Sequence, residues 1–204
     1  LHDGRILVNF ATDVYLGKYR SSVLKLYEYN PISKRLIETK TKTLNNEIYA
    51  TSVSSSLVSL DSGTVYYIPC EEIDGSGENV NLSMKLFDIE TFTVKEYIPL
   101  PIDVKFHASL LALDKENIML IGGAVEEAIG NIDSFVRTND DIYVYNTVSK
   151  VWTKVGTLGL DIPIDIYSLH PVMRKDNKIV VFNSVETGEQ VGNQNTINID
   201  PKTW

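Results

Sequence analysis

Hydrophobic and polar residues alternate in short runs along most of the chain, and turn-forming residues separate the runs. The run 142–146, Ile-Tyr-Val-Tyr-Asn, is an example, and a short polar turn separates it from Val151 and Trp152. Alternation with a period of two is typical of β-strands that pack on one face. No segment keeps a helical period, so the pattern predicts an all-β protein.

Hairpins of this kind recur about every 55 residues along the chain, and a large apolar residue precedes Asn or Asp in each. These apolar anchors are spaced by 58, 58 and 54 positions and are Tyr29, Phe87, Tyr145 and Ile199. Seven residues after the first three anchors stand Leu36, Val94 and Trp152. A period of this length predicts supersecondary units that stack on one another.

Two further apolar runs precede the hairpins, and polar turns separate the two runs. The second runs of the units are 6–10, 65–68, 118–121 and 179–182, and the first runs are 53–60, 106–113 and 166–172. The unit is therefore four antiparallel strands, a to d, joined by an a–b turn, a longer b–c loop and a c–d turn. Such a unit cannot bury both faces alone, so radial stacking of units in a β-propeller is expected.

The repeat divides the chain into four predicted blades, at about 1–45, 49–100, 104–160 and 164–204. We expect the first blade to lack strand a, because the position where that strand would end falls on His2. We expect the last strand of the fourth blade to be incomplete, because the position equivalent to Trp152 would lie beyond residue 204. The chain is thus predicted to be about four blades of a larger ring, with the remaining blades in the same or another chain.

In the third unit, Gly122 and Gly123 end strand b, and Tyr145 and Trp152 follow with six residues between them. With this double glycine and this aromatic spacing, the third unit resembles a kelch repeat. The glycine positions of the other units hold different pairs: Phe10-Ala11, Pro69-Cys70 and Asn183-Ser184. The resemblance implies a protein-binding scaffold or adaptor, such as a ubiquitin-ligase substrate receptor or an organiser of cell polarity or signalling. A divergent propeller of another lineage and an unrelated β-sandwich are the alternatives.

Charge is distributed unevenly over the predicted units. The b–c loops, taken as residues 12–22, 70–81, 124–140 and 184–195, carry formal charges of +1, −4, −3 and −2, which together equal the −8 of the whole chain. A net charge of −8 argues against nucleic acid as a partner, because phosphate binding relies on clustered Lys and Arg. All b–c loops of a propeller emerge on one rim, and an acidic rim attracts basic partners. Solubility alone would also explain acidic loops.

We therefore predict that this rim binds a basic segment of another protein. The acidic residues predicted to bind the partner are Glu71, Glu72, Asp74, Glu78, Glu126, Glu127 and Asp133. The aromatic ones are Tyr15, Tyr19 and Phe135. Aromatic side chains among charges suit an interface, where a few buried anchors supply most of the binding energy.

Residues for catalysis or metal binding are sparse. The histidines, His2, His107 and His170, have no carboxylates at metal-ligand spacing, and a single cysteine, Cys70, excludes a disulfide within the chain. We expect no catalytic residue, no metal, no cofactor and no membrane span, and a cytoplasmic location. The alternative is a kelch-type enzyme, a metal-dependent oxidase or lyase with part of its site outside this chain.

Overall fold

A computed structural model describes residues 1, 3–16, 19–44, 56–61, 63–69, 81–129, 133–158, 168–173, 178–184 and 196–199. Within these ranges the chain forms β-strands and no helix. Every strand pair is antiparallel. The all-β prediction is therefore confirmed for the described part of the chain. That the sheets belong to a kelch-like ring stays a prediction.

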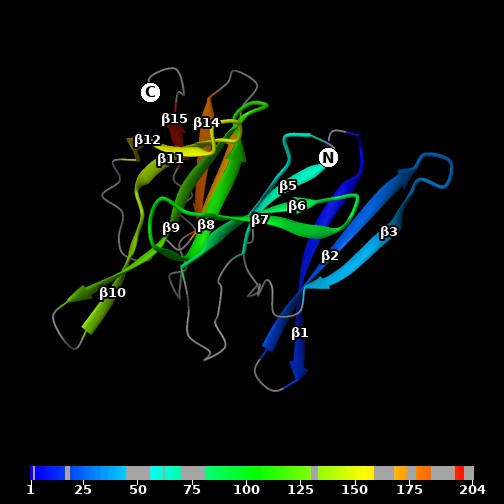
Figure 1. The fold of residues 1–204 in the computed structure, drawn as a ribbon, viewed down its shortest axis with the longest axis horizontal. Coiled ribbons are helices and arrows are strands. Elements are labelled where there is room, and N and C mark those ends of the chain that lie inside the picture. The colour runs from blue at the N-terminus through cyan, green and yellow to red at the C-terminus, as the bar shows by residue number, and fades with distance from the viewer. Residues whose placement is uncertain are drawn as a thin grey trace.

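The described strands form four sheets that follow one another along the chain (Figure 1). Sheet 1 contains β1 (Ile6–Leu16), β2 (Tyr19–Asn30) and β3 (Arg35–Leu44). Sheet 2 contains β4 (Ser56–Val58), β5 (Thr64–Ile68), β6 (Ser83–Asp88) and β7 (Thr93–Pro99). Sheet 3 contains β8 (Val104–Ala112), β9 (Asn117–Ile129), β10 (Asp133–Thr138), β11 (Asp141–Asn146) and β12 (Val151–Thr157). Sheet 4 contains β13 (Ser168–Met173), β14 (Ile179–Ser184) and β15 (Thr196–Ile199).

Three hydrophobic clusters join neighbouring sheets. Sheets 1 and 2 share Leu24, Leu26, Val65, Tyr67, Phe87, Ile89 and Phe92. Sheets 2 and 3 share a larger cluster that includes Tyr66, Ile68, Met84, Leu110, Ile118, Leu120 and Tyr145. Sheets 3 and 4 share Met119, Ile121, Ile142 and Ile179. Successive side chains of β5 and of β9 therefore enter different clusters, which explains why runs 65–68 and 118–121 are apolar throughout.

The Asn or Asp after each of the first three apolar anchors caps the c–d turn. The Oδ1 atom of Asn146 accepts hydrogen bonds from the backbone N–H groups of Val148 and Ser149, at 3.1 and 2.8 Å. Asn30 and Asp88 accept equivalent backbone bonds in their own turns. Each turn ends in a residue with positive φ, which is 55° at Lys34 and 57° at Phe92 and Lys150. Turns that lie 58 residues apart in the sequence thus have the same backbone conformation.

Two of the predicted b–c loops are wrong, because strands form most of them. In the range 12–22, β1 continues to Leu16 and β2 begins at Tyr19. In the range 124–140, β9 continues to Ile129 and β10 pairs with it. Backbone pairing satisfies N–H and C=O groups without an apolar face, so these polar segments extend the hairpins. Most of the other two loops, 70–80 and 185–195, lies outside the described residues.

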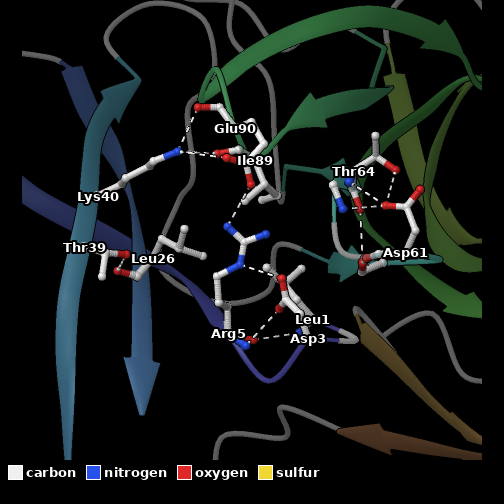
Figure 2. Close-up of polar contacts among 12 residues, drawn as sticks. Leu1, Asp3, Arg5, Leu26, Thr39, Lys40, Asp61, Thr64, Ile89 and Glu90 are labelled. Atoms are coloured by element: carbon white, nitrogen blue, oxygen red, sulfur yellow. Dashed lines mark hydrogen bonds and ion pairs between the residues drawn. The ribbon is translucent and has the colours of Figure 1, made fainter. Parts of the chain in front are cut away.

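Charged side chains also connect sheet 1 to the c–d turn of sheet 2 (Figure 2). Arg5 Nη1 donates to Glu90 Oε1 at 2.9 Å, while Arg5 Nε donates to Asp3 Oδ2 at 2.7 Å. From β3, Lys40 Nζ donates to the backbone oxygens of Ile89 and Glu90, at 3.2 and 2.8 Å. Exposed ion pairs contribute little stability each, so these contacts chiefly orient a junction that apolar burial holds together.

Candidate partner-binding face

The two extended hairpins are the parts of the described chain that match the predicted binding rim. We call residues 12–16 with 19–22 arm 1, and residues 124–129 with 133–138 arm 3. Figure 1 shows both arms projecting beyond their sheets at the lower side of the view, arm 1 from β1 and β2 and arm 3 from β9 and β10. The b–c connections of sheets 1 and 3 therefore lie on one side of the molecule.

The register of arm 3 brings some of the predicted residues together. Phe135 pairs with Glu127, and Asp133 pairs with Ile129. Residues directly opposite one another belong to the same face of a two-stranded hairpin, so Glu127, Phe135 and Asp133 occupy positions of one face. Glu126 pairs with Val136 and occupies a position of the other face.

The remaining predicted residues are placed less completely. Tyr15 lies in β1, and Tyr19 in β2 pairs with Leu16 near the tip of arm 1. The four acidic residues of the second loop lie outside the described residues and are Glu71, Glu72, Asp74 and Glu78. Within the described residues, the predicted binding face therefore consists of arms 1 and 3.

Asn139, which the sequence did not single out, anchors the root of arm 3. Its buried side chain donates from Nδ2 to the carbonyl oxygens of Gly122 and Asp141, at 3.1 and 3.0 Å. Its Oδ1 atom accepts from the N–H of Asp141 at 3.1 Å, and its own N–H donates to Gly123 O at 2.8 Å. A buried amide bonded in this way fixes where the chain leaves β10 and enters β11. The run Asn-Asp-Asp at 139–141 resembles an exposed turn, which is why its burial was not predicted.

The two glycines that resemble a kelch motif lie at the same root. The φ angle is 71° at Gly122 and 92° at Gly123, a region that side chains with a Cβ atom rarely adopt. Before them β9 pairs with β11, and after them it pairs with β10. On the other side of β9 the register of β8 shifts between Val104 and Phe106, and the next residue, His107, has a φ of 60°. The glycines thus mark the point where β9 leaves the sheet for the arm.

An ion pair beside the root is locally neutral. Lys154 Nζ lies 2.6 Å from Asp141 Oδ1, and this hydrogen bond raises the pKa of Lys154. The hydroxyl of Tyr143 donates to Asp141 Oδ2 at 3.2 Å, and burial followed by the Asp141 charge raises the pKa of Tyr143. Lys154 is therefore charged at neutral pH. The excess acidity of residues 124–140 belongs to arm 3 and to Asp140 just after it, because Glu126, Glu127, Asp133 and Asp140 outnumber Arg137.

Among the described residues, no group of three or more His, Cys, Asp or Glu side chains is arranged to hold a metal ion. In the same ranges, no helix is long and apolar enough to cross a membrane. An open cleft of about 430 Å³ is lined by Asp3, Gly4, Arg5, Glu28 and Tyr29. Arg5 in this cleft already bonds Asp3 and Glu90.

Similarity to known proteins lies in the fold and not in the sequence. The sequence matches no family model and no curated protein. The structure is similar to that of a mannose phosphorylase from Leishmania mexicana in complex with phosphate ion, with a TM-score of 0.50 and 15% identity over 98% of this chain. The chain covers 65% of that phosphorylase chain, which is less than two thirds of its length.

Proposed function

We propose that the chain is about four blades of a kelch-like propeller and works as a protein-binding scaffold. Four antiparallel sheets that pack face to face in chain order, and a glycine pair at the root of arm 3, support the architecture. The observation that carries the function is that arms 1 and 3 project on the same side of the molecule. Its partner is a Lys- or Arg-bearing segment of another protein.

The construction of the arms suits this role. Strand pairing orders their backbone before a partner arrives, which reduces the entropy lost on binding. The acidic residues of arm 3 attract a basic segment and speed its encounter. Phe135, opposite Glu127, supplies an apolar residue beside the charge, which is the composition of an interface anchor.

Charge reversal in arm 3 tests the proposal. In the Glu126→Lys/Glu127→Lys variant we expect the set of proteins captured from a native extract to be lost, while circular dichroism and thermal unfolding stay unchanged. The matched control is Glu28→Lys/Glu116→Lys, which reverses two exposed acidic residues outside the arms. Quantitative mass spectrometry compares the captured proteins. An identical partner set for the wild type and both variants would mean that the acidic arms serve only solubility.

A second candidate function is an enzyme whose site lies partly outside this chain. The similarity to a mannose phosphorylase motivates it, although one fold supports many unrelated functions. Metal analysis of the purified protein, together with an assay for consumption of inorganic phosphate in the presence of a mannoside, tests it. Bound copper or iron at one per chain, or consumption of phosphate, would favour the enzyme over the scaffold.

A further inference from the structure

Arm 3 extends beyond the strand that pairs with one side of β9. β8 pairs with β9 as far as Val104, which lies opposite Val125, and no described strand continues this pairing along residues 126–129. On its other side β9 pairs with β10 along the whole arm. Half of the backbone N–H and C=O groups of residues 126–129 therefore point away from β10, toward a side that no described strand covers. We call this side of residues 126–129 the uncovered edge of β9.

The segment just before β8 turns away from the uncovered edge. The N–H of Val104 donates to the backbone oxygen of Ile102 at 2.9 Å, and the backbone oxygen of Val104 accepts from the N–H of Leu82 at 2.7 Å. Asp103 Oδ1 accepts a hydrogen bond from Asn81 Nδ2 at 2.7 Å. These bonds tie the segment to the start of β6, so it does not continue β8 along the arm.

The sequence of this segment also disfavours pairing with the uncovered edge. If β8 were longer, its register with β9 would place Asp103 opposite Glu126 and Pro101 opposite Ala128. Like charges directly opposite one another destabilise a strand pair, and proline has no N–H to donate. The described chain therefore leaves this edge available to a strand from another molecule.

The order of residues along the uncovered edge defines which strand fits it. Glu126 and Glu127 come first, and Ala128 and Ile129 follow toward the tip of the arm. Consecutive residues occupy opposite faces of a strand, so there is one acidic position on each face. An antiparallel strand in line with β8 would meet Ile129 first and Glu126 last. Opposite charges across a strand pair stabilise it, so the matching segment has two apolar residues followed by two basic ones.

We propose that arm 3 binds its partner by strand addition: a segment with two apolar residues, followed by Lys or Arg at the next two positions, pairs antiparallel with residues 126–129 of β9. The inference rests on the proposed function, since it describes how the basic segment of a partner protein binds arm 3. In complexes of this kind backbone pairing supplies the affinity, and side chains supply the selectivity. The outer edge of β10 carries Arg137 as well as Asp133, so it suits a basic strand less.

Fluorescence anisotropy with a labelled peptide, Thr-Thr-Val-Val-Lys-Lys-Thr-Thr, tests the proposal on the intact chain. The matched control is the same peptide N-methylated at the second Val and the first Lys, which keeps every charge but removes one N–H from each edge of the peptide strand. We expect the methylated peptide to bind at least ~10-fold more weakly, because its backbone can no longer pair with β9. Equal affinities, or no binding of the unmethylated peptide up to ~1 mM, would overturn strand addition.

Hydrogen exchange of backbone amides, followed by NMR, identifies where the peptide binds. We expect exchange to slow at those amides of residues 126–129 that point away from β10, because the added strand accepts their hydrogen bonds. Slowing at the outward amides of residues 133–138 instead would place the peptide on β10 and overturn the proposal. Slowing at residues 126–129 without peptide, as the chain concentration is raised, would show that a second copy occupies the edge and would also overturn it.

Strand addition and the scaffold proposal fail on different results. Strand addition fails if methylation of the peptide has no effect, even when the Glu126→Lys/Glu127→Lys variant loses its captured proteins. Partner binding through the acidic arms fails if that variant captures the same proteins as the wild type.

Discussion

Sheets 1 and 3 share the design of the c–d hairpin and differ in what covers it. Asn30 and Asn146 cap their turns in the same way, and Lys34 and Lys150 end them with nearly equal positive φ angles. Yet the anchor of sheet 3 is buried, whereas the anchor of sheet 1 is largely exposed. Contacts within about ten residues therefore specify the hairpin, whereas the burial of its anchor residue depends on a neighbouring sheet.

This difference determines where the stability of the chain resides. Tyr145 contacts Trp152 with ring centroids 4.9 Å apart, and Tyr66 of sheet 2 with centroids 6.5 Å apart. Sheet 3 is also in contact with a sheet on each side. We therefore expect amide hydrogens of β11 to exchange more slowly than those of β2, because exchange reports local opening.

The largest expected effect comes from truncating the two equivalent tyrosines. Tyr145→Ala removes a buried ring between two sheets and should lower the free energy of unfolding by about 3–5 kcal/mol. Tyr29→Ala removes an exposed ring and should change it by no more than ~0.5 kcal/mol. Urea denaturation measures both. Equal losses of unfolding free energy in the two variants would mean that Tyr29 is buried like Tyr145, which would contradict the contrast between sheets 1 and 3.

A smaller effect is expected at the root of arm 3. Gly123→Ala places a Cβ atom at a φ of 92° and should cost about 1–2 kcal/mol of stability. Gly156→Ala is the control, because a Cβ atom at that position meets nothing within 4 Å. Thermal unfolding of the two variants gives the difference. Arm 1 forms with Phe10 and Ala11 at the positions of the glycines, so an unaffected Gly123→Ala variant would indicate that neither arm needs glycine.

The smallest effect concerns acid sensitivity of the turn in sheet 2, where Asp88 stands at the position of Asn30 and Asn146. The hydrogen bond from the Thr91 N–H, followed by that from its hydroxyl, lowers the pKa of Asp88 below its usual 3.8. A lowered folded-state pKa adds stability that is complete above the unfolded-state value and is lost as the pH falls through the folded-state value.

Asp88→Asn should keep the turn and remove this titration. We expect melting temperatures close to those of the wild type at pH 7, and a shallower decline for the variant below about pH 4. The turn of Asp114 provides an internal reference. Burial alone would raise the pKa of Asp114, but hydrogen bonds from Glu116 and Asn117 outweigh it and lower the pKa. Some acid sensitivity therefore persists in the variant, and parallel curves for the two proteins would refute the role of Asp88.

The sequence was sufficient to predict strands and turns but not the arms or the exposure of Tyr29. Apolar runs such as 65–68 and Asx residues such as Asn146 act locally, so their effects are visible in the sequence. The arms are held by backbone pairing of mixed polar residues, which leaves little alternation to detect. Tyr29 and Tyr145 have the same local pattern, so only the packing of sheets distinguishes them. Asn139 was missed for the same reason, because its burial depends on the path of β9.

The sharing of β5 and β9 between two clusters also limits how this chain can change in evolution. A one-residue insertion in run 65–68 or 118–121 would exchange the side chains that face each neighbour and disturb two junctions at once. An insertion at the tip of arm 1 or arm 3 would disturb neither. Length variation between relatives of this protein should therefore collect in the arms, and new binding specificities can arise there while the stacked sheets stay unchanged.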